Sequence, residues 1–210
     1  MLSTQREEIN VSINKAKNDG ATPFSTACKN KHIEVVKLLL NDQRVDRNKV
    51  NEYSWTPFWS ACKDGIESIE IVKLLVNDQR VDINKSARKG QISPFYIACY
   101  CQHVEIVEYI LTSGREIDMS KIDAKGQIIF ITDTVRKKRN EEIRFWESKK
   151  EFQQRKRNYG VILELLESFE RNPDETRFKL RLKLGLSSKI NLFISLFAFT
   201  FFFFSFFLLF

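Results

Sequence analysis

Cysteine and histidine recur at a spacing that can hold a metal ion. Cys28 is followed four residues later by His32, and Cys99 by His103, which places each pair on one face of a helix. Zinc, however, needs four ligands that converge on one point. Each pair takes the same place in a repeating unit of the sequence, and packed helical units lie roughly 10 Å apart. We therefore expect no metal site.

The remaining reactive side chains form no active site. Both His residues hold a structural position in the repeating unit of the sequence, so neither remains as a base that could activate a Ser or Cys nucleophile. The seven Gly are scattered and provide no phosphate-binding loop. The carboxylate pairs Asp42/Asp46 and Asp78/Asp82 sit in linkers, where Asp commonly turns the chain. We expect a protein that is not an enzyme, with no catalytic residue, no cofactor and no small-molecule substrate.

The elements that carry these residues repeat along the chain. The triplet Thr22-Pro23-Phe24 recurs as Thr56-Pro57-Phe58 and as Ser93-Pro94-Phe95, at offsets of 34 and then 37 residues, and Ala-Cys follows each triplet. An apolar run with charges at helical spacing comes next in each unit, first at residues 33–39. Self-similarity at such a period indicates a repeat architecture.

Each unit is expected to form two short helices. The Thr or Ser before each Pro can cap the first helix with its hydroxyl, and Pro at the first helical position loses no needed donor. In the first unit Phe24, Ala27 and Cys28 then share one face, which is the spacing of a buried stripe. Because neither helix can close a core of its own, the units must stack side by side.

These units resemble ankyrin repeats, a family with a period of 33 residues whose first helix opens with Thr-Pro-Leu-His. The resemblance covers about residues 11–125. The family's His is replaced by Ser25, Trp59 and Tyr96, so the hydrogen bonds that this His makes between neighbouring repeats are expected to be absent. Repeat two carries a two-residue insertion, which predicts a bulge at residues 66–68.

The whole chain is expected to be all-α with short β-hairpin loops: an ankyrin-type helical repeat solenoid followed by a charged helical arm and a C-terminal hydrophobic helix. The N-terminal edge leaves two alternatives open, a stub cap or a shortened copy of a longer array. The expected parts are an N-terminal stub and partial repeat linker (1–17), three ankyrin-like repeats (18–125), a degenerate capping repeat with a charged and amphipathic helical region (126–187), and a transmembrane helix (190–210).

The resemblance also implies where a protein partner binds. In ankyrin-like stacks this is usually the concave side, which the hairpin tips and the first helices form. Trp and Tyr are the residues that most often dominate binding energy. The expected contacts are Tyr53, Trp55, Trp59, Lys63, Arg88, Lys89, Tyr96 and Tyr100. Trp59 and Tyr96 have a second interpretation, in which they only fill the position of the missing His between repeats.

The segment after the repeats is strongly charged. Residues 136–157 contain neither Gly nor Pro, which favours a long solvated helix with Ile143, Trp146 and Phe152 as packing points. The amphipathic residues 161–169 are expected to fold back onto the last repeat. Beyond them, Asn172 and Pro173 predict a helix start, although the alternation that follows is typical of a strand; we favour the helix.

The positive charge lies almost wholly in the C-terminal part. Residues 1–125 carry 18 Lys and Arg against 17 Asp and Glu, whereas residues 126–210 carry 16 against 10. The basic pI therefore does not indicate a nucleic-acid-binding first domain, and no nucleic-acid partner is expected. Residues 1–10 lack the apolar core of a signal peptide. We expect cytosolic repeats with free thiols.

The end of the chain is a separate apolar segment. Residues 190–210 carry no charged side chain, and ten of the 18 Phe fall between Phe193 and Phe210. A helix of this length covers roughly 30 Å, enough to cross a bilayer, and the basic residues before it favour a cytosolic N-terminal side. We expect a single-pass, tail-anchored membrane protein. The anchor in the lipid bilayer would include Ile190, Leu196, Phe202 and Phe210.

The Phe-rich tail has a second interpretation. T-rich DNA beyond a lost stop codon encodes Phe, because TTT and TTC both specify it. The natural protein would then end near Ser187. It would be a soluble, cytoplasmic and degenerate member of an expanded ankyrin repeat family, and the tail would be a gene-model or read-through extension.

Overall fold

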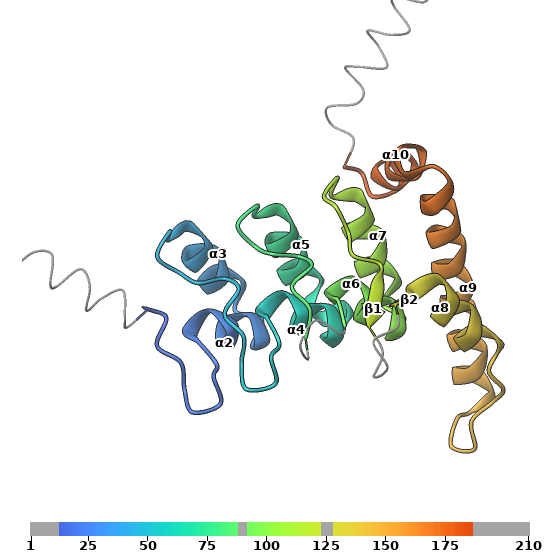
Figure 1. Ribbon diagram of the computed structural model, residues 1–210, viewed down its shortest axis with the longest axis horizontal. Helices are drawn as coiled ribbons and strands as arrows, with labels where there is room; N and C mark the ends of the chain where they lie inside the picture. Colours follow the sequence, from blue (N-terminus) through green and yellow to red (C-terminus); the bar gives the residue numbers. More distant parts are fainter. Residues whose placement is uncertain (1–12, 88–91, 123–127, 187–210) are drawn as a thin grey trace, which may run out of the picture.

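The computed structural model describes residues 13–87, 92–122 and 128–186. Three helix pairs follow one another along the chain: α2 (Pro23–Lys29) with α3 (Ile33–Asn41), α4 (Pro57–Asp64) with α5 (Ile69–Asn77), and α6 (Pro94–Tyr100) with α7 (Val104–Thr112). The first helices α2, α4 and α6 pack in one row, and the second helices α3, α5 and α7 pack in a row beside it (Figure 1). The three repeats therefore form a stack.

A fourth helix pair continues this stack. Helix α8 (Ile131–Asn140) packs against α6, and helix α9 (Lys149–Arg171) packs against α7, so each extends one of the two rows. Helix α10 (Pro173–Lys183) then crosses over α7 and α9 (Figure 1). Residues 161–169 thus fold back onto the last repeat, as their amphipathic pattern predicted.

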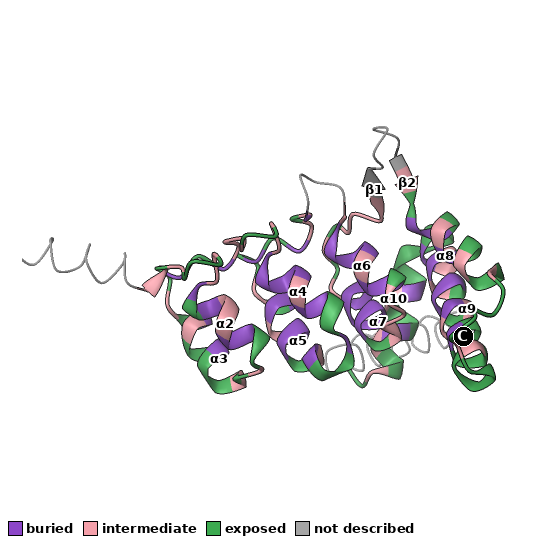
Figure 2. Ribbon diagram, turned by 90° about the horizontal axis from the view of Figure 1, so that it is seen from below, coloured by how far each residue is buried: buried purple, intermediate pink, exposed green. Residues whose placement is uncertain are grey.

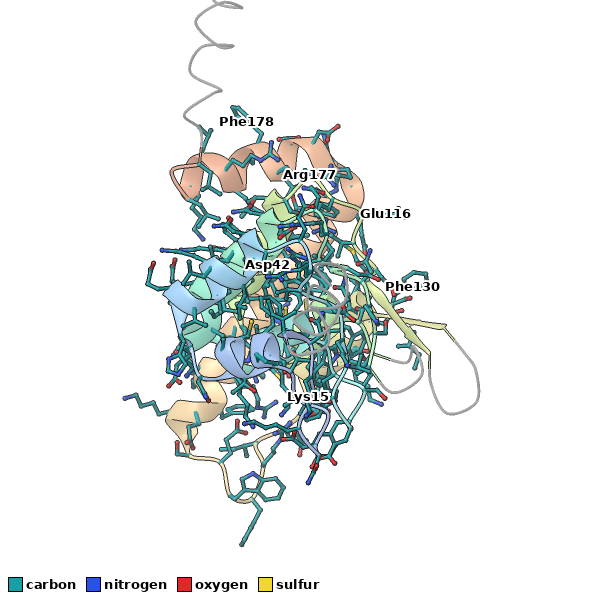
Figure 3. The ribbon with its side chains drawn as sticks, turned by 90° about the vertical axis from the view of Figure 1, so that its left-hand side faces the viewer. Lys15, Asp42, Glu116, Phe130, Arg177 and Phe178 are labelled. Carbon is teal, nitrogen blue, oxygen red and sulfur yellow. The ribbon has the colours of Figure 1, made fainter. Side chains whose placement is uncertain are left out.

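A two-stranded hairpin leads into the fourth pair. Strands β1 (Ser120–Ile122) and β2 (Ile128–Phe130) are antiparallel, with Ser120 opposite Phe130. Phe130 extends from the hairpin into solvent, while Arg177 and Phe178 mark α10 at another end of the molecule (Figure 3). The predicted short β-hairpin loops are therefore present between the third and fourth pairs.

The predicted helix starts are confirmed. The hydroxyls of Thr22, Thr56 and Ser93 each accept a hydrogen bond from the backbone N–H three residues on, at 3.0–3.1 Å, and each is followed by Pro at the first helical position. Asn172 caps α10 in the same way, with its Oδ1 3.1 Å from the backbone N of Glu175. The alternating residues of α10 are helical, because a local cap and Pro173 begin the helix ahead of them.

The hydrophobic core lies between the two helix rows. Figure 2 shows buried residues along the facing sides of both rows. Phe24, Phe58 and Phe95 occupy equivalent positions in the three first helices and are each 1% exposed. The core continues through Ile162 on α9 to Leu180 on α10. Burying these side chains offsets the conformational entropy that each short helix loses on folding.

The prediction of one long solvated helix over residues 136–157 is wrong. Helix α8 ends at Asn140, α9 begins at Lys149, and residues 141–148 form a loop between them. The break lets the two helices lie side by side against the third repeat, where Val135 and Tyr159 become buried. Ile143 and Trp146, which were expected to be packing points, are exposed in this loop.

The insertion in repeat two forms the predicted bulge. Residues Ile66–Ser68 make a turn of 3₁₀ helix (η1) between α4 and α5. Gly65, which precedes it, has a φ of 84°, and a Cβ placed there would lie 2.5 Å from Cε1 of His103. The His103 Nε2 lies 2.9 Å from the Lys63 carbonyl oxygen. A histidine therefore does link two neighbouring repeats, although it comes from the turn before a second helix rather than from the replaced position.

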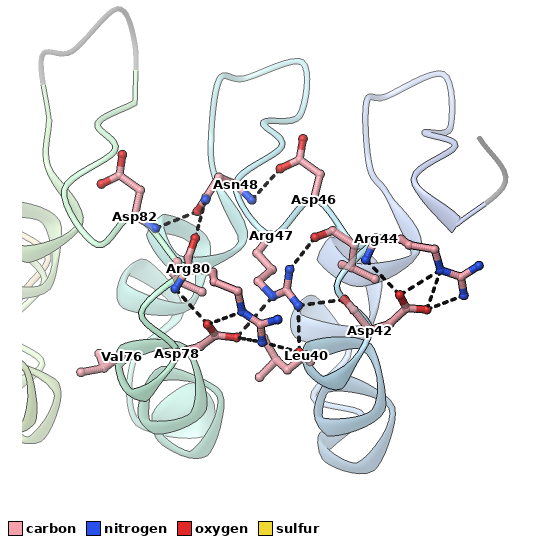
Figure 4. Close-up of polar contacts among 12 residues, drawn as sticks. Leu40, Asp42, Arg44, Asp46, Arg47, Asn48, Val76, Asp78, Arg80 and Asp82 are labelled. Atoms are coloured by element: carbon pink, nitrogen blue, oxygen red, sulfur yellow. Dashed lines mark hydrogen bonds and ion pairs between the residues drawn. The ribbon is translucent and has the colours of Figure 1, made fainter. Parts of the chain in front are cut away.

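Asparagines of the linkers join each repeat to the next. The Asn48 side chain donates from Nδ2 to the Arg80 carbonyl at 2.8 Å and accepts from the Asp82 backbone N at 2.9 Å (Figure 4). Asn14 and Asn84 make the same pair of bonds to the linkers that follow them. Three equivalent side chains thus hold four successive linkers in register.

A buried arginine adds a second connection between repeats. Arg47 is 5% exposed and donates to the carbonyls of Leu40 and Asp42, both at 2.8 Å. It also forms an ion pair with Asp78 of the following repeat at 3.3 Å (Figure 4). The hydrogen bond from Arg80 lowers the pKa of Asp78, so this carboxylate stays charged between the two guanidinium groups at neutral pH.

Some of the predicted parts lie outside the described residues. These are most of the N-terminal stub (1–12) and the whole expected membrane segment (190–210), with its anchor residues Ile190, Leu196, Phe202 and Phe210. Within the described ranges, no helix combines the length and the apolar character that crossing a bilayer requires.

Candidate functional site

The cysteines and histidines are placed as parts of the stack. Cys28, Cys62 and Cys99 are buried free thiols, and burial raises the pKa of Cys28 to about 12. A thiol with so high a pKa stays protonated and is a poor nucleophile and metal ligand at neutral pH. In the ranges that the structure describes, three or more His, Cys, Asp or Glu residues nowhere come together as a metal site.

The hairpin of repeat two presents two aromatic side chains. Asn51 Oδ1 accepts hydrogen bonds from the backbone N of Tyr53 and of Trp55, both at 3.0 Å. Ser54 has a φ of 63°, a left-handed conformation that closes the turn between them. These local bonds fix the backbone from which Tyr53 and Trp55 project.

The hairpin tips of repeats one and two touch each other. The Glu52 backbone N donates to the Asp19 carbonyl oxygen at 3.0 Å. Gly20 has a φ of 77°, and a Cβ placed on it would lie 2.9 Å from the same Glu52 nitrogen. Glycine is therefore required at this position, both by the backbone conformation and by the close approach. The two tips form one continuous surface.

Three aromatic rings contact one another in a row that leads inward from this surface to the buried Trp59. The Tyr53 and Trp55 ring centroids are 5.1 Å apart, and those of Trp55 and Trp59 are 4.7 Å apart with planes inclined by 24°. The Lys63 ammonium lies 4.7 Å from the centroid of the Trp55 ring. Stacked rings and a cation–π contact hold Trp55 in place. Tyr53 at the outer end is 59% exposed.

A groove of about 220 Å³ runs beside the aromatic stack. Its walls are the two hairpin tips and the first helices α2 and α4. Lys17 and Lys29 line it together with Asp19 and Glu52, so both signs of charge lie near the rings. We call this surface the aromatic groove; it consists of Lys17, Asp19, Ala21, Ser25, Thr26, Lys29, Asn30, Asn51, Glu52, Tyr53, Trp55, Pro57 and Ser60.

Trp59 and Tyr96 are not surface residues, which corrects their assignment to the partner-binding face. Trp59 is 3% exposed and Tyr96 is 2% exposed. The Trp59 Nε1 donates to the Ile92 carbonyl at 3.1 Å, and the Tyr96 hydroxyl lies 2.8 Å from Thr134 Oγ1. Both rings fill the position between repeats that the missing His would occupy.

The other predicted contacts do not all lie together. Tyr53 and Trp55 line the aromatic groove, and Lys63 contacts the Trp55 ring beside it. Tyr100 is partly exposed at the end of α6, where the Lys138 ammonium lies 5.5 Å from its ring centroid. It therefore belongs to the junction with the fourth helix pair. Arg88 and Lys89 lie outside the described residues.

Sequence reasoning missed some polar residues of the groove. Thr26 and Ser60 were not among the expected contacts, yet both line it. Each lies four residues after the hydroxyl that caps its helix, Thr22 or Thr56. The shared position in the two repeats is the sequence signal that could have found them, because equivalent positions of stacked repeats face the same side.

A comparison with family models now bears on these repeats. A model described as ankyrin repeats in three copies matches residues 2–87 and again residues 43–123. The chain is an ankyrin repeat protein. A comparison with curated proteins finds no match. The ankyrin match includes both walls of the aromatic groove, whereas helices α8 to α10 lie beyond it.

Proposed function

We propose that this ankyrin repeat protein is a non-catalytic scaffold that binds a protein partner through the aromatic groove. Ankyrin repeats typically mediate protein–protein interaction. The observation that carries the proposal is the fixed stack of Tyr53 and Trp55 beside a groove that bears both signs of charge. Rigid aromatic side chains supply large contact areas at little cost in conformational entropy.

The groove favours a partner segment with an apolar side chain flanked by polar groups. An apolar side chain would pack on the outer face of Tyr53, while Lys29 and Lys63 would attract carboxylates. Trp55 adds a further reason for binding there. Its Nε1 is shielded from solvent and has no hydrogen-bond partner among the described residues. A buried donor left unpaired costs free energy, and an acceptor on the partner would relieve that cost once the Trp55 ring shifts to expose the donor.

Capture of a partner by the full chain tests this proposal. We expect Tyr53→Ala and Trp55→Ala each to weaken capture at least tenfold, because truncated hot-spot residues cost about 2 kcal/mol or more. The matched control is Leu38→Ala, which removes an exposed apolar side chain from α3, away from the groove. Equal capture by all variants would contradict the proposal, provided that circular dichroism shows them folded.

We further propose that residues 190–210 anchor the scaffold in a membrane with its repeats in the cytosol. The support is the sequence: an uncharged segment of bilayer length that follows a basic helix. The full chain should then stay with membranes during alkaline carbonate extraction. Its recovery in the soluble fraction, or a transcript with a stop codon near Ser187, would instead favour a soluble, degenerate repeat protein.

A further inference from the structure

The loop between α8 and α9 carries large apolar side chains in solvent. Ile143 is 50% exposed, Trp146 is 80% exposed, and Phe145 is fully exposed. In the part of the chain that the structure describes, no other large apolar residue is as exposed as Phe145. Scattered exposed apolar residues are normal on protein surfaces, whereas a cluster of them marks an interaction site.

The backbone of this loop places both aromatic rings at its tip. The Glu147 backbone N donates to the Arg144 carbonyl oxygen at 2.9 Å, which closes a turn with Phe145 and Trp146 as its two central residues. Gly, Pro, Asn, Asp and Ser dominate such positions, because they favour turn geometry. Turn geometry does not favour aromatic residues at these two positions, and their exposure points to a contact outside the chain.

A buried arginine of α9 holds the loop in place through hydrogen bonds. Arg155 donates to Glu147 Oε1 at 2.7 Å and to Glu147 Oε2 at 2.8 Å. It also donates to the carbonyls of Lys138, at 3.3 Å, and Glu142, at 3.1 Å. Both ends of the loop are thus fixed to α9. A tip that is already ordered loses little conformational entropy when it binds.

Positive charge exceeds negative charge in the segment that carries the tip. Residues 137–150 contain six Lys and Arg against three Glu. Four of these cations are exposed and take part in no ion pair with a described residue: Lys137, Arg139, Lys149 and Lys150. The loop therefore combines a protruding apolar tip with a cationic rim, and the surface that complements it is apolar beneath an anionic layer.

An anionic lipid bilayer has that chemistry. Trp and Phe prefer the membrane interface, and Lys and Arg are attracted to anionic headgroups. A protein partner would need a pocket matched to the tip, whereas fluid lipid deforms around it. We propose that the α8–α9 loop is a lipid-binding loop, which inserts Phe145 and Trp146 into the interface of an anionic bilayer.

This contact is separate from the proposed anchor. The loop and α10 lie at opposite ends of α9 (Figure 1), a helix of 23 residues that is about 34 Å long. The loop proposal therefore does not depend on residues 190–210. A single bilayer that held both contacts would run along α9.

Quenching of Trp146 by brominated lipids tests the proposal on the full chain. Vesicles of phosphatidylcholine alone are compared with vesicles that contain about one third phosphatidylserine. The difference between the wild type and Trp146→Phe isolates Trp146 from Trp55 and Trp59. We expect quenching of Trp146 in the anionic vesicles and much less in the neutral ones.

Variants then assign the effect to the loop. Phe145→Ala should lower the ratio of inserted to free loop about tenfold, and Lys149→Gln and Lys150→Gln should each lower it about fivefold. The control Leu38→Ala should leave the ratio unchanged. The absence of Trp146 quenching in anionic vesicles that hold the chain would overturn the proposal. The proposal would also be overturned if the loop variants abolished capture of a soluble protein and Trp146 of the wild type stayed unquenched. Carbonate extraction of the same vesicles reports on residues 190–210 independently.

Discussion

Replacing Asn48 with Ala removes one of the three equivalent asparagine side chains that join successive linkers. The side chain makes two hydrogen bonds, to the Arg80 carbonyl at 2.8 Å and from the Asp82 backbone N at 2.9 Å. Both bonds run from one repeat to the next. The substitution therefore weakens an interface between repeats and leaves the core of each repeat intact.

The size of the effect follows from these two bonds. A typical intramolecular hydrogen bond contributes about 0.5–1.5 kcal/mol to stability, so two contribute about 1–3 kcal/mol. Both bonds lie at an exposed edge of the linkers, where water can hydrate the groups left behind. We expect Asn48→Ala to lower the free energy of unfolding by about 1–2 kcal/mol.

Urea denaturation of residues 1–186, followed by far-UV circular dichroism, measures this change. The core formed by the described residues lies within this range. Asn51→Ala is a matched control, because Asn51 also makes two side-chain hydrogen bonds, to the backbone N of Tyr53 and of Trp55, but within one hairpin. Asn48→Ala should in addition lower the m-value, since weakened coupling lets repeats unfold separately. A loss below about 0.3 kcal/mol, or an m-value equal to that of Asn51→Ala, would show that Asn48 does not couple the repeats.

Three further substitutions test single positions. Gly65→Ala should cost about 2–3 kcal/mol in urea denaturation, because its Cβ would lie 2.5 Å from Cε1 of His103; an unchanged midpoint would contradict this. Gln102→Gly should raise stability by about 0.5–1 kcal/mol, since Gln102 has a φ of 67°; a lower melting temperature would show that its side chain matters more than the strain. Finally, Glu147→Gln should flatten the loss of stability in acid. The hydrogen bond from Arg155 lowers the pKa of Glu147 below 4.5, so the stability that Glu147 contributes is complete above that pH and is lost as the pH falls through the lowered pKa. An equal loss of stability in acid for the wild type and for Glu147→Gln would argue against this.

The repeats and their helix starts could be predicted because the signals are local. Thr22 and Pro23 lie next to each other in the sequence, and the cap that they form involves only the first turn of α2. Stacking then follows from apolar stripes that no single helix can bury. The same logic predicted α10 from Asn172 and Pro173, against a strand-like alternation that carries no start signal.

The fourth helix pair could not be predicted in detail because tertiary contacts determine it. The composition of residues 136–157 favours helix throughout, although Ser148 and Glu151 form a capping box, a local signal that begins α9 at Lys149. The loop exists because Arg155 binds carbonyls and a carboxylate that are 8 to 17 residues away. Burial of Tyr159 and Val135 against the third repeat favours two short helices over one solvated helix.

The candidate site was predicted only in part for a similar reason. Tyr53 and Trp55 could be assigned to the surface because hairpin tips of such repeats project from the stack. Trp59 occupies a first helix in which exposure depends on the next repeat, and there the Ile92 carbonyl accepts its indole N–H. Sequence spacing places a residue on a helix, but packing of the neighbouring repeat decides whether it is buried.

Photo-crosslinking from position 53 shows whether a protein binds at the aromatic groove. A photoreactive amino acid replaces Tyr53 in the full chain expressed in cells, and the same amino acid replaces Glu70, an exposed residue of α5, as a control. We expect a discrete crosslinked protein from position 53 that is absent from position 70 and is lost when Trp55→Ala is added. The same products from both positions, or a position 53 product that survives Trp55→Ala, would contradict it.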